Sequence, residues 1–411
     1  MKAVVFTLGC KVNECESDSL IAGLIERGYE VSDKLEKADL YIVNTCAVTQ
    51  EAEKKSRQTE ARIKKLSPCA KIIYTGCAVQ KNFKPFAEKS DKYLITGTFN
   101  KQKILDLIDN VGVHISPEQK EFENLNYVKT LRTRAYIKVQ DGCNNFCSYC
   151  IIPYLRGRSR SRDINSIIDE INSINPKEAV INGINLSAYN YEGKTLADLI
   201  DELRVVNCRI RLGSLEAMVI DDRLLTAMKN LKNFAPHFHL SLQSGSDNVL
   251  KKMNRHYTTE QYLQKVDLIR KYFPDAGITT DIIVGFPTET EEDFKDTLSF
   301  VDKVGFSDIH PFTFSPRSGT VAYKMPDLAP NVKKQRLNLL MEKKIICKEN
   351  FVKKMTGKIV DFLFEECKDG YGEGYSENYL RLYVKDYTGE KEIKKVRVLD
   401  EFKDGALAQI I

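Results

Sequence analysis

Asp141-Gly142-Cys143-Asn144-Asn145-Phe146-Cys147-Ser148-Tyr149-Cys150 is the stretch that decides the fold, because it follows a strand-like run at residues 135–139 and precedes alternating strands and helices. Three thiolates on one short loop can bind three irons of a cubane cluster and leave the fourth iron without a protein ligand. A zinc site is the alternative, but structural zinc takes four protein ligands, and no second cysteine pair lies at suitable spacing. The loop therefore predicts an iron–sulfur site with an open iron.

Beyond this loop the sequence predicts a parallel α/β region. Asp163 is a suitable N-cap for a helix whose apolar spacing is carried by Ile164, Ile167, Ile168 and Ile171. Strands are expected at residues 179–181, 209–212, 239–242 and 278–284. This repetition predicts a partial (β/α) barrel with its function at the carboxyl ends of the strands.

The first hundred residues show a similar alternation. Apolar runs at residues 3–8, 40–43 and 71–74 predict strands, and residues 16–26 and 51–66 predict helices. Strand–helix–strand repetition implies a doubly wound parallel sheet that is covered on both faces.

One cysteine follows each of these three strands: Cys10, Cys46 and Cys77. Loops at the carboxyl ends of parallel strands meet at one edge of a sheet, so a three-thiolate site is expected there. Buried structural cysteines are the alternative. The shared placement favours the ligand interpretation, whereas the other five cysteines are predicted to be structural: Cys15, Cys69, Cys208, Cys347 and Cys367.

The last part of the chain predicts a separate small domain. A polar linker is expected at residues 114–128, and a long basic helix at residues 331–355. Short strands are expected at residues 358–365, 379–384, 393–398 and 406–410, which suggests an all-β barrel of OB-like size. Such barrels bind single-stranded nucleic acid or serve as packing domains, and both readings stay open. The predicted domains are residues 1–115, 130–348 and 349–411.

Composition narrows the class of protein. The 411 residues are 42% hydrophobic and 29% charged, which suits folded domains. We find no signal peptide and no apolar run long enough for a bilayer, so a cytoplasmic protein without a membrane partner is expected. In a reducing cytoplasm the 11 cysteines are more suited to ligand or structural roles than to disulfides. The net charge of +5 weakly favours a polyanionic partner.

An arginine-rich run follows the cysteine loop. Alternating positions on an extended chain point to one side, so four arginines are expected to form a stripe that contacts RNA phosphates: Arg156, Arg158, Arg160 and Arg162. A solvated stripe, or pairing with carboxylates, is the alternative.

The Cys-x3-Cys-x2-Cys loop after the first barrel strand resembles the signature of the radical S-adenosylmethionine (SAM) superfamily. The extra amino-terminal domain of the methylthiotransferases is resembled by the segment Thr7-Leu8-Gly9-Cys10-Lys11-Val12-Asn13 together with Cys46 and Cys77. The predicted carboxyl-terminal barrel resembles the TRAM domain of the same family. Within that family, the form of residues 9–13 and 44–49 is most similar to the branch that modifies N6-threonylcarbamoyladenosine beside the tRNA anticodon.

The resemblance implies two [4Fe–4S] clusters and SAM as cofactors. Cys143, Cys147 and Cys150 would hold the cluster that binds SAM, and Cys10, Cys46 and Cys77 would hold a second cluster that carries sulfur. Cleavage of SAM would give a 5′-deoxyadenosyl radical that removes the C2 hydrogen of the adenine. A methylated sulfur from the second cluster would then bond to that carbon, and a second SAM would be consumed as the donor of the methyl group. The implied partners are the tRNA anticodon stem–loop, a sulfur donor, and an electron donor such as flavodoxin or ferredoxin.

The resemblance also implies SAM-binding residues at later strand ends: Asn182, Gly183, Glu216, Ser241 and Gln243. Asn182 and Gly183 lie where the superfamily often has a Gly-Gly-Glu type motif, from which this sequence departs. Ordinary strand-to-helix turns are the alternative. No side chain is assigned as a catalytic acid or base.

Three other functions remain alternatives: methylthiolation of isopentenyladenosine in tRNA, methylthiolation of a ribosomal-protein aspartate, and non-catalytic RNA binding by a metal-stapled protein.

Overall fold

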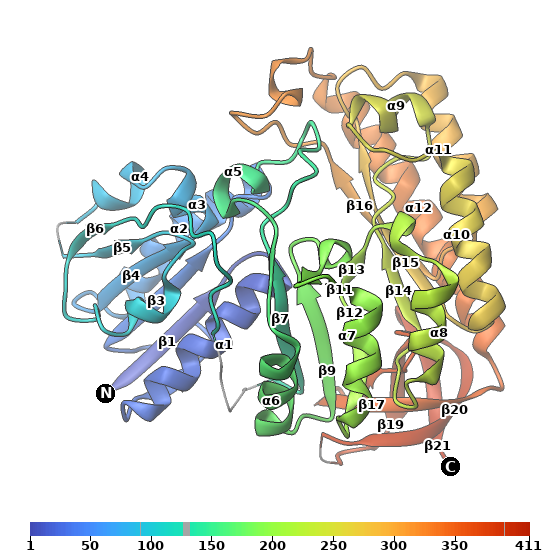
Figure 1. Cartoon of the computed structure of the whole chain (residues 1–411), viewed down its shortest axis with the longest axis horizontal. Coiled ribbons are helices and arrows are strands. Elements are labelled where there is room, and N and C mark those ends of the chain that lie inside the picture. Colours follow the sequence, from blue (N-terminus) through green and yellow to red (C-terminus); the bar gives the residue numbers. More distant parts are fainter. Residues whose placement is uncertain (91, 126–131, 390) are drawn as a thin grey trace. The chain divides into compact units, whose positions relative to one another are not determined.

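The computed structural model describes residues 1–90, 92–125, 132–389 and 391–411 (Figure 1). The chain divides into two compact units. Unit 1 comprises Met1–Asn175, Asn182–Gly193 and Ser315–Tyr323, and unit 2 comprises Pro176–Ile181, Lys194–Phe314 and Lys324–Ile411. The cysteine loop thus belongs to the same compact unit as the amino-terminal sheet. The division into domains at residues 115, 130 and 349 stays a prediction from the sequence.

Unit 1 contains a six-stranded parallel sheet in the order β2-β1-β3-β4-β5-β6. The strands are β1 (Lys2–Thr7), β2 (Glu30–Ser32), β3 (Leu40–Thr45), β4 (Lys71–Gly76), β5 (Leu94–Thr96) and β6 (Gly112–His114). Helices between them are α1 (Lys11–Glu26), α2 (Gln50–Leu66), α3 (Cys77–Lys81) and α4 (Lys84–Ala87). The predicted doubly wound sheet is confirmed, while the three-residue strands β2, β5 and β6 were too short for a periodic signal.

Helix α1 begins at Lys11, five residues before the predicted start at residue 16. The apolar pattern underestimates its length because Asn13 and Glu16, polar residues of the first turns, are buried. Asn13 and Glu16 can be buried because residues distant in sequence hydrogen-bond or ion-pair with their polar atoms. The spacing of apolar residues gives no information about such contacts.

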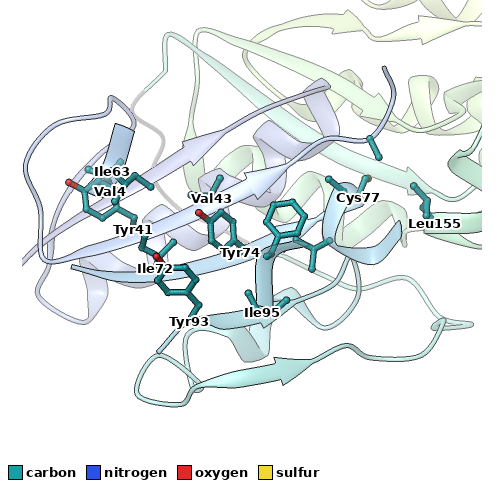
Figure 2. Packing of buried hydrophobic residues seen from close by; sticks show 14 of the residues in the cluster. Val4, Tyr41, Val43, Ile63, Ile72, Tyr74, Cys77, Tyr93, Ile95 and Leu155 are labelled. Carbon is teal, nitrogen blue, oxygen red and sulfur yellow. The ribbon is translucent and has the colours of Figure 1, made fainter. Parts of the chain in front are cut away.

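The cysteine loop of unit 1 is held at both ends. Strand β7 (Arg134–Asp141) leads into it, and α5 (Ile152–Arg156) follows it. Leu155 of α5 belongs to the same buried cluster as Val43, Tyr74 and Cys77 of the amino-terminal sheet, as Figure 2 shows. The apolar core of the sheet therefore fixes the exit of the loop.

Of the next two elements of unit 1, the helix was predicted and the short strand was not. A short antiparallel partner of β7, strand β8 (Arg160–Ser161), is followed by α6 (Ile164–Ile174). The Asp163 side chain accepts a hydrogen bond from the Ser166 amide, so the predicted N-cap is confirmed. The predicted linker begins one residue too early, because His114 ends β6. Residues 115–125 form no helix or strand, and residues 126–128 of that prediction lie outside the described residues.

Unit 2 carries parallel strands separated by helices. Strand β9 (Glu178–Gly183) spans the boundary and pairs with β12 (Arg209–Leu212). A second parallel sheet contains β13 (Ser214–Leu215), β14 (His237–Leu240), β15 (Gly277–Val284) and β16 (Asp308–Thr313). The intervening helices include α8 (Asp222–Asn230), α10 (Thr259–Tyr272) and α11 (Glu291–Val304). Strand β14 ends two residues before the predicted residue 242, and the Leu242 amide donates to the Thr280 hydroxyl rather than to a carbonyl of a neighbouring strand.

The carboxyl-terminal part begins with the basic helix α12 (Pro330–Met355). A closed five-stranded barrel follows, formed by β17 (Ile359–Lys368), β18 (Tyr371–Tyr375), β19 (Arg381–Lys385), β20 (Ile393–Phe402) and β21 (Gly405–Ile410). Strand β18 was not predicted, because its glycines weaken the strand signal. A Cβ at Gly374 would lie 2.0 Å from the Leu363 carbonyl oxygen, so the close pairing of β17 and β18 requires glycine there.

Within the described ranges, none of the helices is both long and apolar enough to cross a bilayer.

Candidate functional site

Three cysteines lie at the carboxyl edge of the amino-terminal sheet. Cys10 is the N-cap of α1 after β1, Cys46 follows β3, and Cys77 is the first residue of α3 after β4. Because β1, β3 and β4 are adjacent and parallel, their ends share one edge. The predicted placement of the three cysteines directly after these strands is confirmed.

The three thiols influence one another electrostatically. Burial, reinforced by the charges of Cys77 and Cys10, raises the pKa of the Cys46 thiol to about 12. Gly9 makes the approach of Cys10 possible: its φ is +114°, and a Cβ there would lie 2.9 Å from the Cys46 sulfur. A side chain at residue 9 would therefore push the β1 loop away from Cys46.

The second cysteine set lies on the loop between β7 and α5. The Cys143 sulfur is 3.5 Å from the donating amide of Asn145 and 3.8 Å from the donating Nδ2 of Asn185. Cys150 donates its amide to the Cys147 carbonyl oxygen at 2.9 Å, which turns the loop back on itself. Cys147 is buried, and Cys143 and Cys150 are half-buried, so the loop presents sulfur partly to solvent.

The donor chemistry of both sets fits an iron–sulfur cluster. All six candidate ligands are cysteine sulfurs, which suit iron–sulfur chemistry better than magnesium or calcium. Among the residues that the structure describes, no three His, Cys, Asp or Glu side chains are gathered as closely as a single metal ion requires. A cubane is larger than one ion and takes its thiolates at separate corners, so wider spacing suits it.

A buried charge cluster lies beside the first cysteine set, and Arg156 is at its centre. Its Nη1 donates to Glu16 Oε1 at 2.7 Å and to Asp141 Oδ1 at 3.2 Å. Its Nη2 donates to Asn13 Oδ1 at 2.7 Å. Burial raises the pKa of the Cys77 thiol, whereas the charge of Arg156 and a hydrogen bond from it act to lower that pKa.

Glu16 is surrounded by cations. Lys101 and Lys138 each place Nζ 3.0 Å from its carboxylate, which is fully buried. Burial opposes ionisation of Glu16, but the charges of Arg156, Lys101 and Lys138 outweigh it and hold its pKa well below the usual range. We call Arg156, Glu16, Asp141, Lys101, Lys138 and Arg160 the buried charge cluster.

The predicted arginine stripe does not form. Gly157 has a φ of +71°, which breaks the extended conformation that the alternation assumed. Arg156 and Arg162 are buried, the latter in an ion pair with Glu170, and Arg160 pairs with Asp141. The prediction of four arginines on one exposed side is therefore wrong, because carboxylates in the fold take up three of them. Arg158 alone of the four is exposed, with its guanidinium 4.6 Å from the centre of the Phe146 ring.

Asn182 and Gly183 lie in unit 1 at the end of β9. A Cβ at Gly183 would be 2.9 Å from the Gln140 side chain, so glycine permits this packing. The Nδ2 of Asn182 is buried and has no hydrogen-bond partner among the described residues. An amide donor in that state suits a bound ligand, and the SAM contact of these residues stays a prediction.

Glu216, Ser241 and Gln243 lie in unit 2. The Arg255 side chain bridges the first two, since it pairs with Glu216 at 3.0 Å and donates to the Ser241 carbonyl oxygen at 3.2 Å. Gln243 donates its amide to the Asp281 carbonyl oxygen at 2.9 Å. Their SAM-binding roles likewise remain predictions.

Sequence reasoning missed several residues that support the sites. Asn13 and Glu16 lie in α1, three and six residues after Cys10, and Asn185 lies two residues after Gly183. The signal for Asn13 was present in the quoted segment of residues 7–13, but its contact with Arg156 joins positions 143 residues apart. No local spacing encodes such a pair.

Comparisons with known proteins place this chain among iron–sulfur enzymes. A family model described as "Uncharacterized protein family UPF0004" matches residues 2–97, and one described as "Radical SAM superfamily" matches residues 137–301. The threonylcarbamoyladenosine tRNA methylthiotransferase MtaB of Aquifex aeolicus is 37% identical over 376 residues, which cover 87% of this chain and 91% of the relative. The tRNA-2-methylthio-N(6)-dimethylallyladenosine synthase of Clostridium novyi is 38% identical over 387 residues, which cover 88% and 85%.

A solved structure supports the fold. The radical S-adenosylmethionine methyltransferase TsrM from Kitasatospora setae aligns with a TM-score of 0.55 at 14% identity, covering 76% of this chain and 74% of that one. With the closed carboxyl-terminal barrel and the amino-terminal parallel sheet, this likeness confirms the predicted α/β architecture with a central partial barrel.

The ionisation of Glu16 generates a testable prediction. Glu16→Gln leaves three buried cations without their shared carboxylate, so the free energy of unfolding should fall by about 3–5 kcal/mol near neutral pH. Because its folded-state pKa is lowered, Glu16 contributes fully above an unfolded pKa of about 4.3, and this contribution is lost as pH falls toward the folded value. Urea unfolding followed by circular dichroism should therefore show the difference between the two proteins shrinking in acid.

Glu14→Gln is the matched control on the same helix, because Glu14 pairs with Arg132 and 24% of its side chain is exposed. It should cost no more than about 1 kcal/mol. Equal losses in the two variants, or a difference that does not depend on pH, would contradict the assignment of Glu16.

Proposed function

This chain belongs to the radical SAM methylthiotransferase family, and from that premise we propose that it converts N6-threonylcarbamoyladenosine beside the tRNA anticodon to its 2-methylthio derivative. The chain is accordingly an enzyme, a transferase. The observation that carries the proposal is the presence, in one compact unit, of two three-cysteine sets, one at a sheet edge and one on the Cys-x3-Cys-x2-Cys loop.

The choice of nucleoside rests on the relatives named for threonylcarbamoyladenosine and on the form of residues 9–13 and 44–49. Isopentenyladenosine is the second candidate, because a relative named for the dimethylallyl nucleoside has nearly the same identity to this chain.

Family membership implies SAM and one [4Fe–4S] cluster. We assign that cluster to Cys143, Cys147 and Cys150, and a second one to Cys10, Cys46 and Cys77. Bound there, the clusters supply reductive cleavage of SAM and a sulfur to transfer. The protein supplies binding and orientation: Asn182 and the other predicted SAM-binding residues would hold the methionine and nucleoside parts.

The tRNA is the proposed macromolecular partner, and the cytoplasm is the proposed location. Exposed Arg158 beside the cysteine loop would contact the RNA backbone, and the barrel of β17–β21 would add further contacts. On β20, exposed Lys395 and Arg397 alternate with buried Val396 and Val398, so both cations lie on the outer face of the strand, where Lys395 also pairs with Asp361 at 3.0 Å. A reductant such as flavodoxin or ferredoxin and a sulfur donor complete the proposed partners.

Nucleoside mass spectrometry of tRNA from cells with and without this gene tests the proposal. Loss of only the 2-methylthio form of threonylcarbamoyladenosine is expected. Loss of the isopentenyl analogue or of a ribosomal-protein modification would overturn the substrate and keep the family. Unchanged nucleosides and ribosomal proteins would favour a non-catalytic RNA-binding protein.

The two cysteine sets should respond differently to substitution. Cys143→Ala should abolish both formation of 5′-deoxyadenosine from SAM and tRNA modification, because the SAM-binding cluster is lost. Cys77→Ala should retain some SAM cleavage and lose sulfur insertion. Cys69→Ala, at an exposed cysteine outside both sets, is the control and should retain both activities. Normal sulfur insertion by Cys77→Ala would refute the second-cluster assignment.

Arg158→Ala should weaken tRNA binding. Removal of one phosphate contact is expected to reduce the slope of log affinity against log salt by roughly 0.7–0.9. Arg204→Ala removes the same charge from an exposed residue outside the proposed interface and should leave the slope unchanged. Equal binding by native protein and Arg158→Ala across salt concentrations would exclude this contact.

A further inference from the structure

We propose that Arg156 is a positioning residue for the Cys77 ligand of the second cluster and that its positive charge raises the reduction potential of that cluster. The inference rests on the proposed function, because it requires a cluster at Cys10, Cys46 and Cys77. It assigns to Arg156 a role different from the RNA contact that the sequence suggested.

Arg156 is held rigidly. Only 1% of its side chain is exposed, and both terminal nitrogens donate hydrogen bonds to α1, through Glu16 and Asn13. A forked donor held in this way loses little conformational freedom when it binds another group. Its Nη2 and the Cys10 thiol both donate to Asn13 Oδ1, at 2.7 Å and 3.9 Å, which places the guanidinium beside the first cysteine set. Its Nε is buried and has no hydrogen-bond partner among the described residues, so the guanidinium retains donor capacity there.

The surroundings of Arg156 carry excess positive charge. Within the described part of the chain, the ion pairs of four cations of the buried charge cluster, Arg156, Lys101, Lys138 and Arg160, involve two carboxylates, Glu16 and Asp141. Glu123 is a further carboxylate close to Lys138 and Lys101, and burial raises its pKa, which weakens it as a counter-charge. Three cysteine thiolates would supply the missing negative charge.

Arg156 also connects the two cysteine sets along the chain. Asn13 and Glu16 follow Cys10 on α1, while Asp141 precedes Cys143 at the end of β7. The Asp141 side chain accepts from the Gly142 amide at 2.8 Å and from Arg156, so one guanidinium touches the elements that carry both sets. A change at Arg156 should therefore alter the environment of the second cluster.

The test isolates the second cluster in the full chain. A Cys143→Ala, Cys147→Ala, Cys150→Ala protein, reconstituted with iron and sulfide without oxygen, should retain one cluster. Its reduction potential is measured by titration followed by electron paramagnetic resonance, with and without Arg156→Gln. Since a nearby positive charge stabilises the reduced cluster, Arg156→Gln should shift the potential downward and change the spectrum.

Two further variants separate positioning from folding. Arg156→Lys keeps the charge but lacks the forked donors, so its potential should lie between those of Arg156 and Arg156→Gln. Arg162→Gln removes another buried, ion-paired arginine of the same segment, paired with Glu170, and should leave the potential unchanged. If Arg156→Gln does not fold, Arg156→Lys carries the test.

Two outcomes would overturn the inference, and they differ. An iron-loaded protein with the same potential in all four forms contradicts the role of Arg156 and leaves the proposed function intact. A triple-alanine protein that binds no iron contradicts the second cluster, and the inference falls with it.

Discussion

The buried ion pair between Glu16 and Arg156 is the interaction on which the rest of unit 1 depends. Both side chains are almost completely excluded from water, and each is costly to bury alone. Burial is tolerated because Lys101, Lys138 and Asp141 complete the network. The pair joins α1, whose N-cap is Cys10, to α5, which follows the cysteine loop, so it connects the elements that carry both candidate sites.

The sheet supplies the second constraint. Parallel strands bring Cys10, Cys46 and Cys77 to one edge although as many as 67 positions separate them in the chain. Glycine is required where the loops approach closely, as at Gly9 against Cys46. The backbone thus determines where the sulfur atoms lie, and the buried charge cluster places positive charge near them.

Much of the fold followed from periodicity, and the candidate ligands followed from spacing. Helix α6 has a strong repeating apolar pattern, with Ile164, Ile167 and Ile171 on its buried face. All six cysteines were identified as candidates from their positions after strands or on one loop. The arginine run was misread, because alternation predicts direction only for an extended chain, and Gly157 bends this one. The partners of Arg156 were inaccessible to local reasoning, since Glu16 lies 140 residues away.

The anchoring of α5 in the amino-terminal core limits how the protein can be divided. Ile151 and Leu155 are buried against side chains that come from residues before position 100. A fragment starting near residue 130 would expose both side chains, at a cost of about 1.5–3 kcal/mol each, and would leave Arg156 without Glu16. The segment that the Radical SAM family model matches therefore contains a loop and a helix whose apolar side chains share the core of the amino-terminal sheet, and a cut near residue 130 should destabilise this part of the chain.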